Sequence, residues 1–221
     1  LDAYYKYQLE NEDKSLKKGT GYRLVENILK INSFFSSDER QVEVIILSKN
    51  NAATSLRITN AINDLKLDII RSAWTSGTNI SNYLKAFKVD LFLSADDNDV
   101  LNAIENGVAA AKILHSNENI HNISNEQVRI AFDGDAVLFS EESELVYKNH
   151  GLEAFIEHEK ENRNNPLEMG PFAKLLLTIA KIQAKFPTDK SPIRTALVTA
   201  RSAPTHERVI KTFNVWGVRV D

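Results

Sequence analysis

Hydrophobic and polar positions alternate between two periods along the chain, which predicts helices and strands in succession. Apolar residues recur every three or four positions in some segments and form short continuous runs in others. The predicted helices are 1–12, 22–31, 53–65, 80–87 and 100–114, and the predicted strands are 42–47, 67–72, 89–93 and a run from Val128. This alternation predicts an α/β fold with a parallel sheet flanked by helices.

Some segments carry predictions about burial. In the first helix, the spacing favours Ala3, Tyr4, Tyr7 and Leu9 as its buried positions. The run Val42 to Leu47 is almost continuously β-branched, which is typical of a strand that is buried on both faces.

The sequence also repeats at an offset of 151 residues. Residues 1–70 align with 152–221 without a gap, and 16 of the 70 pairs are identical, where average composition gives about four or five by chance. We therefore predict parts of two copies of one α/β unit. Residues 1–114 form a first, degenerate copy without its first strand, 115–126 a linker rich in Asn and Ser, and 127–221 a second copy. The chain opens without Met inside a predicted helix, which indicates a fragment.

Composition narrows the classes of partner. Lys and Arg together number 27 against 30 acidic residues, with no long basic run, so nothing favours a nucleic-acid surface. No apolar run reaches the roughly 20 residues of a membrane helix. The chain has no cysteine, which excludes disulfides and thiolate chemistry and is compatible with the cytoplasm. The expected partner is a small molecule.

The strand from Val128 ends in two carboxylates, Asp133 and Asp135, one residue apart. Strand ends are where open α/β sheets place their chemistry. We expect Gly134 to let the backbone turn so that both acids face one ligand. Two carboxylates at such a place suggest a divalent cation with an anionic substrate. An Asx-type turn that merely closes the strand is the structural alternative.

A second strand, Ile193 to Val198, ends in Thr199 and is followed by Arg201. A hydroxyl at a strand end can bind a phosphoryl oxygen, and the N-terminus of a following helix offers N–H groups to the same anion. The alternative is an ordinary strand exit with a threonine cap. For Arg201 two roles stay open, contact with the phosphate or capping of the sheet edge.

These two stretches, Phe132-Asp133-Gly134-Asp135-Ala136-Val137-Leu138-Phe139-Ser140 and Leu197-Val198-Thr199-Ala200-Arg201-Ser202-Ala203, resemble the cytosolic type I 5′-nucleotidase family of the haloacid dehalogenase superfamily. The resemblance implies a Rossmann-like fold and a cytoplasmic, magnesium-dependent hydrolase of nucleoside 5′-monophosphates. It implies that Asp133 is the nucleophile, Asp135 the acid/base and Thr199 a phosphate-binding residue, with Gly134 and Arg201 as substrate-binding candidates. Mg²⁺ would be held by the Asp133 carboxylate and the Asp135 backbone carbonyl.

The superfamily pattern also requires a lysine and one or two further acids. The first copy contains Lys85 near the lysine position, but Ala95 stands where the metal-binding acid belongs. We interpret Asp96, Asp97 and Asp99 as a solvated cap on the helix that follows. The alternative is that Lys85 with Asp96 or Asp97 completes the site around Asp133.

Between the two motif strands, residues of about 141–170 form a charged helical insertion. The resemblance implies a cap over the phosphate site, and a helical hairpin packed on the sheet is the plain alternative. A truncated sheet with an unpaired edge predicts a homo-oligomer.

Two other functions compete with the hydrolase. The chain as it stands could be a non-catalytic scaffold piece, since its second copy stops before the last two motifs. An Asp-x-Asp glycosyltransferase would use the same two acids, but it explains neither Thr199 nor the repeat.

Overall fold

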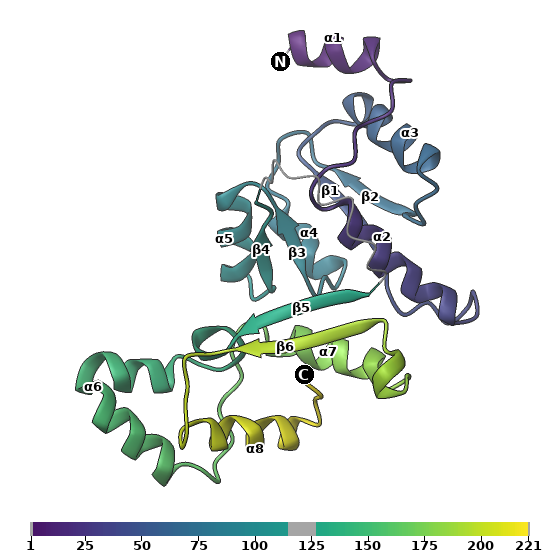
Figure 1. Ribbon diagram of the computed structural model, residues 1–221. Coiled ribbons are helices and arrows are strands. Elements are labelled where there is room, and N and C mark those ends of the chain that lie inside the picture. The colour runs from purple at the N-terminus through teal and green to yellow at the C-terminus, as the bar shows by residue number, and fades with distance from the viewer. Residues whose placement is uncertain (1, 115–126, 221) are drawn as a thin grey trace. The chain divides into compact units, whose positions relative to one another are not determined.

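The computed structural model describes residues 2–114 and 127–220, and the predicted linker 115–126 lies outside them (Figure 1). The strands are β1 (Ile45–Ser48), β2 (Arg71–Trp74), β3 (Phe92–Ser94), β4 (Ala110–Lys112), β5 (Val128–Asp133) and β6 (Ile193–Val198). They pair in two-stranded sheets, of which β1–β2 and β5–β6 are parallel. A mixed α/β chain with short parallel sheets fits a Rossmann-like fold.

The helices separate these strands along the chain. They are α1 (Asp2–Glu10), α2 (Tyr22–Lys30), α3 (Leu56–Asp64), α4 (Ser81–Ala86), α5 (Asp97–Glu105), α6 (Glu142–Glu161), α7 (Ala173–Gln183) and α8 (His206–Trp216). Short 3-10 turns precede α3 (Ala53–Ser55) and follow α2 (Ile31–Phe34). Among the described residues, no helix combines the length and the apolar character that crossing a membrane requires.

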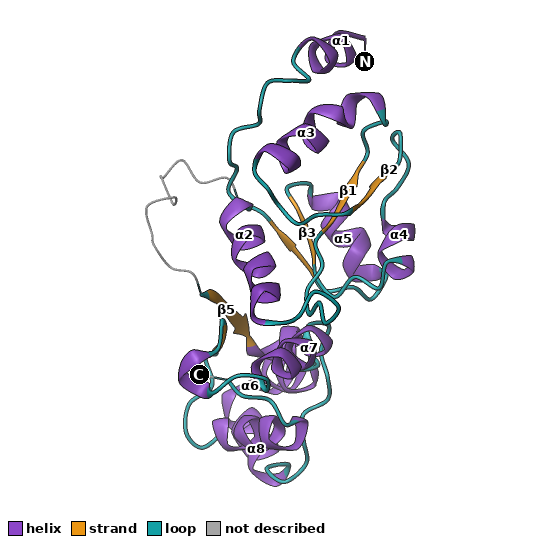
Figure 2. Ribbon diagram, turned by 90° about the vertical axis from the view of Figure 1, so that its right-hand side faces the viewer, coloured by secondary structure: helices purple, strands orange, loops and turns teal. Residues whose placement is uncertain are grey.

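The chain divides into two compact units. The first contains most of the described residues up to 114, and the second contains 127–220 with the short pieces Val89–Phe92 and Ala103–Ala111. In the first unit β1 runs beside β2, from Ile45 opposite Arg71 to Ser48 opposite Trp74 (Figure 2).

Three predictions about residues 2–114 were wrong in detail. The predicted helix 100–114 stops at Glu105, because Gly107 takes a left-handed backbone with φ of 75° that ends the helix, and β4 follows. The strands predicted at 67–72 and 89–93 begin later, as β2 and β3.

Burial also differs from the sequence prediction. Strand β1 is half-buried throughout and not buried on both faces, since its sheet has only two strands. On α1 the four positions predicted to be buried, Ala3, Tyr4, Tyr7 and Leu9, are exposed. Apolar spacing alone therefore overestimated the core of this unit.

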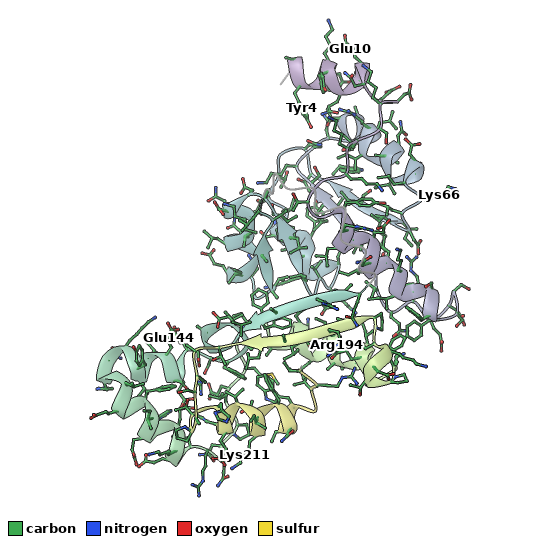
Figure 3. All side chains as sticks on the ribbon, in the orientation of Figure 1. Tyr4, Glu10, Lys66, Glu144, Arg194 and Lys211 are labelled. Carbon is green, nitrogen blue, oxygen red and sulfur yellow. The ribbon has the colours of Figure 1, made fainter. Side chains whose placement is uncertain are left out.

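In the second unit, β5 and β6 lie side by side with both C-terminal ends toward α6, and α7 packs against β6 (Figure 1). An aromatic cluster supports the strand exit, because Phe139 is fully buried and lies 5.6 Å from Phe213 and 5.7 Å from Trp216, between ring centroids. Helix α6 bends at Gly151, whose φ is 83°. Charged side chains join α6 to α8, on which Figure 3 labels Glu144 and Lys211.

Contacts recur in residues 2–64 and 153–215 at the same offset of 151. Four hydrogen bonds of the first region recur in the second, with donor and acceptor both 151 residues further along. In the first region they are Asn11 Nδ2 to Tyr7 O, Asn50 N to Ser48 Oγ, Thr54 Oγ1 to Asn51 O and Arg57 Nε to Lys14 O. Their equivalents, in the same order, are Asn162 Nδ2 to His158 O, Arg201 N to Thr199 Oγ1, Thr205 Oγ1 to Ser202 O and Arg208 Nε to Asn165 O. Helices α2 and α7 also begin 151 residues apart. We call these shared contacts the common framework.

Candidate active site

The parallel register of β5 and β6 brings the two sequence motifs to one edge of their sheet. Asp133, the last residue of β5, lies opposite Val198, so Thr199 follows at the same edge. Gly134 directly follows Asp133 in the chain. A Cβ at this position would be 3.4 Å from Thr199 Oγ1, closer than most contacts of that kind. The glycine therefore permits a close approach of the two strand exits.

The chain turns after the strand within Gly134–Leu138. Asp133 has an extended backbone, and its Oδ1 accepts a hydrogen bond of 2.7 Å from the Gly134 N–H. The left-handed residue is Ala136, with φ of 58°. Asp135 keeps an extended backbone with φ of −71° and ψ of 139°. The left-handed backbone of this turn therefore lies after the second carboxylate, and Gly134 is not among the residues with a positive φ.

The two carboxylates have different surroundings. Asp133 is exposed at the strand end. The Asp135 carboxylate receives a two-pronged contact from Arg201, with Nε 3.0 Å from Oδ2 and Nη2 2.5 Å from Oδ1. The side chain of Asp135 is 26% exposed, whereas that of Arg201 is 2% exposed. Arg201 therefore approaches Asp135 from the protein side and leaves the other side open to solvent.

Behind Arg201 lies a buried carboxylate. The side chain of Glu159, on α6, is fully buried, and its Oε2 accepts a hydrogen bond from Arg201 Nη1. Its Oε1 accepts from Arg208 Nη1 at 3.1 Å and from Ser143 Oγ at 2.8 Å. We call Asp135, Arg201, Glu159 and Arg208 the charge cluster.

The buried charges of the cluster are compensated by hydrogen bonds between opposite charges within it. Burial disfavours the charged form of Arg201, but the hydrogen bond and the charge of Asp135, together with those of Glu159, outweigh this and raise the pKa of Arg201. Arg201 also lies over the ring of Phe155, with its Cζ 5.3 Å from the ring centroid. The guanidinium is therefore held on several sides.

Around the charge cluster, Glu142 and His158 of α6 form a more exposed layer. His158 Nε2 lies 3.0 Å from Glu142 Oε1 and 3.5 Å from Arg208 Nη1. The side chain of Glu142 is 39% exposed, and its Oε2 is 3.6 Å from Arg208 Nη2. Among the described residues, neither Glu142 nor His158 forms a hydrogen bond or ion pair with Arg201.

The ends of the charged segment 141–170 lie together at the strand exit. Ser140 N donates to Glu168 O at 2.9 Å, and Gly170 N donates to Leu138 O at 2.8 Å. Gly170 is sterically required, because a Cβ there would be 2.3 Å from Phe139 O and 2.6 Å from Val137 O. Segment 141–170 therefore starts and ends beside residues 138–140, which follow the Asp133 motif.

Hard oxygen donors of the type that Mg²⁺ prefers are present at the strand exit. They are the exposed Asp133 carboxylate and the backbone carbonyl of Asp135, whose side chain is engaged by Arg201. In the part of the chain that the structure describes, no group of three or more His, Cys, Asp or Glu could hold a metal by itself. This donor set suits an ion that completes its shell with water and substrate phosphate, as Mg²⁺ usually does.

The acidic run of the first unit has local partners. Asp96 Oδ1 accepts from Asp99 N at 3.0 Å and so caps α5, as its sequence indicated. Asp97 pairs with Lys112 at 2.8 Å, and Asp99 pairs with Lys49 at 2.6 Å, which raises the pKa of Lys49. Lys85 lies in α4 of the same unit. These contacts suit the helix-cap interpretation.

Sequence reasoning did not single out Glu159, Arg208 or Ser143. A weak signal existed, since Arg208 is identical to Arg57 in the repeat while Glu159 replaces Gln8. An acid that departs from a repeated neutral residue is a hint that can be found without a structure.

Comparison with known proteins agrees with the motifs. The profile of a family described as 5′-nucleotidase matches residues 1–221. Cytosolic 5′-nucleotidase 1B of Homo sapiens is 35% identical over 230 residues, covering 100% of this chain and 38% of the human protein. The chain thus spans about two fifths of the length of this relative. No solved structure matches this chain.

Proposed function

The chain belongs to the 5′-nucleotidase family, and from this premise we propose that it hydrolyses nucleoside 5′-monophosphates to nucleoside and inorganic phosphate. The observation that carries the proposal is the meeting of Asp133, Asp135 and Thr199 at one edge of the β5–β6 sheet. A relative named as cytosolic supports a cytosolic location for this chain as well.

In the first step, a carboxylate oxygen of Asp133 attacks phosphorus. The bond between phosphorus and the nucleoside 5′-oxygen breaks, and the phosphoryl group stays on Asp133 as an aspartyl-phosphate. Asp135, in its protonated form, donates its proton to the departing 5′-oxygen, which leaves as the nucleoside hydroxyl. The exposed position of Asp133 suits this attack.

In the second step, Asp135 is a carboxylate and takes a proton from water. The water oxygen attacks phosphorus, the bond to Asp133 breaks, and inorganic phosphate leaves. Asp133 returns as a carboxylate and Asp135 as an acid, so one water is consumed per turnover. Asp135 needs access to solvent for this exchange, and its side chain is partly exposed.

The neighbouring residues would bind and orient the phosphate. Thr199 Oγ1 would donate to a phosphoryl oxygen, and the proximity of Gly134, which has no side chain, to this hydroxyl supports the role. Arg201 stays a substrate-binding candidate, although its guanidinium here contacts Asp135 and Glu159. The Asp133 carboxylate and the Asp135 carbonyl would hold Mg²⁺. When bound, the ion neutralises charge that otherwise repels an anionic substrate from the two acids.

The architecture is proposed along with the activity. The recurring hydrogen bonds of the common framework support two copies of one α/β unit, with boundaries near 1–114 and 127–221. The joined ends of segment 141–170 support its action as a cap on the second copy. Short sheets with open edges support a homo-oligomer.

The test is magnesium-dependent phosphate release from AMP, IMP and dTMP, measured on this chain and on a polypeptide that continues past Asp221. We expect activity that Asp133→Asn abolishes and that Asp189→Asn, an exposed acid of the same type, leaves intact. Activity that survives Asp133→Asn contradicts the mechanism. Absence of activity in both polypeptides favours the non-catalytic scaffold.

A further inference from the structure

The charge cluster is not required by the fold that surrounds it. At the offset of 151 residues, Glu159 corresponds to Gln8 and Arg201 to Asn50, and both of these are neutral. The common framework is nevertheless present around them, including the bonds of Arg57 and Arg208 to the backbone at 2.8 Å each. A neutral pair is thus compatible with the framework, and the charged pair in 153–215 needs another explanation.

Placing such charges inside a protein is costly. Removing a carboxylate and a guanidinium from water is energetically unfavourable, and a protein with well-packed neutral residues in their place is often as stable or more so. The side chains of Glu159 and Arg201 are 0% and 2% exposed. A pair that stability does not demand, and that ends on Asp135, points to a role at the site.

We propose that Glu159 is a positioning residue, which fixes Arg201 so that Arg201 holds the Asp135 carboxyl group in the orientation needed for proton transfer. This inference rests on the proposed function and deepens it. Glu159 itself touches neither substrate nor metal. It acts from α6, so the segment proposed as the cap also sets the geometry of the acid/base.

The geometry of the guanidinium supports this role. Its donors lie in one rigid plane, so fixing one edge fixes the other. Nη1 is directed to Glu159, while Nε and Nη2 are directed to Asp135. Arg201 therefore cannot turn away from Asp135 without leaving Glu159 buried with one partner fewer.

Asp135 remains able to work while held. A carboxylate has about four acceptor positions, and Arg201 contacts Oδ1 with Nε and Nη2 but Oδ2 with Nε alone. An accepting position of Oδ2 therefore stays available for the transferred proton. Because a misplacement of about 1 Å can cost about 100-fold in rate, loosening Arg201 is expected to lower the rate of chemistry with little effect on binding.

The test compares leaving groups. The departing 5′-oxygen of a nucleotide needs a proton, whereas the phenolate from 4-nitrophenyl phosphate leaves without one. For Glu159→Gln we expect kcat/KM on AMP to fall about 10- to 100-fold, with KM changed less than about threefold. On 4-nitrophenyl phosphate the kcat/KM of the same variant should fall less than about threefold. A merely structural defect would lower both rates equally.

The matched control is Glu142→Gln. It makes the same change on the same helix, beside Arg208 but without contact to Arg201. We expect its kcat/KM on AMP to stay within about twofold of wild type. An equal loss in both variants would overturn the proposal.

A second variant covers the case in which Glu159→Gln does not fold. Arg201→Lys keeps the positive charge between the two carboxylates but loses the planar fork, and the same selective loss on AMP is expected. If wild type does not hydrolyse the aryl ester, the change is repeated in an Asp135→Asn background. There Glu159→Gln should alter the residual rate less than about twofold.

The outcomes separate the two proposals. Absence of magnesium-dependent nucleotide hydrolysis both from the unaltered chain and from the polypeptide that continues past Asp221 refutes the proposed function. Wild type with activity, together with a Glu159→Gln variant that is fully active or equally impaired on both substrates, refutes the positioning role alone.

Discussion

The regions 2–64 and 153–215 make different contacts at equivalent positions. In the first, Asn50 Oδ1 accepts a hydrogen bond of 3.3 Å from the Tyr4 hydroxyl. At the equivalent place in 153–215, Arg201 lies over the ring of Phe155. Likewise Arg57 lies over the ring of Tyr7, with its Cζ 5.8 Å from the centroid, where Arg208 approaches His158. The same positions meet in both regions, but the neutral Asn50 of the first is replaced by the cation Arg201 in the second, while Arg57 and Arg208 carry a charge in both.

This difference distinguishes the contacts that stabilise the fold from the charges that lie beside the proposed site. Each shared contact joins a backbone atom to a polar side chain, of Asn, Ser, Thr or Arg, and such contacts stabilise turns and helix ends. The charges that differ gather behind Asp135, beside the proposed site. Substitutions at equivalent positions can therefore test the comparison directly, each serving as the control of the other.

The largest effect is expected at the shared arginine. Arg208 is 3% exposed and pairs with buried Glu159, so Arg208→Ala leaves a buried charge with one partner fewer and should cost about 3–5 kcal/mol of unfolding free energy. Arg57→Ala removes a more exposed hydrogen bond and should cost about 1 kcal/mol. Urea unfolding measures both. Equal losses would mean that the two regions do not differ in this way.

The strand exits should differ in activity. Thr199→Val removes the hydroxyl proposed to bind phosphate and should lower kcat/KM on AMP about 100- to 1,000-fold. Ser48→Ala, at the equivalent exit, should stay within about twofold. Steady-state kinetics on both variants decides the point, and a comparable loss in Ser48→Ala would assign chemistry to the first region.

The equivalent glycines should differ in stability. Gly170→Ala drives a Cβ against the Phe139 and Val137 carbonyls, and we expect a cost of about 2–3 kcal/mol. Gly19 has no atom within 4 Å of such a Cβ, so Gly19→Ala should change stability by less than about 0.5 kcal/mol. Thermal unfolding measures the difference. A Gly170→Ala variant as stable as wild type would show that the close approach is dispensable.

The smallest effect concerns pH and a contact found only in the first region. Hydrogen bonds from Arg71, at 2.5 Å for Nε, lower the pKa of Glu43 below its ordinary 4.5. The equivalent residue is Arg194 on β6, labelled in Figure 3, so this pair cannot recur there. Folding favours ionised Glu43, and the stability it adds is present above pH 4.5 and lost as the pH falls through the lowered pKa.

Because Glu43 and Arg71 are both partly exposed, solvent screens the pair and its contribution to stability should be small. Wild type should therefore unfold at a slightly higher temperature than Glu43→Gln at pH 7, and the difference should shrink as the pH falls below 4.5. A difference that grows on acidification would reverse the predicted sign.

Part of the site could be predicted from sequence because it depends on strand ends. Two apolar runs that stop at Asp133 and at Thr199 must meet if the strands are parallel neighbours, and the register of β5 and β6 has this arrangement. The turn was harder to predict. Gly134 was the natural candidate for a left-handed backbone, but Ala136 adopts it, because its surroundings override the local preference.

The sequence by itself determined the succession of elements, the repeat and the position of the two motifs, since each depends on local spacing along the chain. Only the tertiary structure decided which charges meet. Arg201 reaches Asp135 across 66 residues and Glu159 across 42, and no spacing rule connects them. Such pairing depends on how α6 packs beside the strand exits, because a buried charge is stable only where its partners come within hydrogen-bond distance.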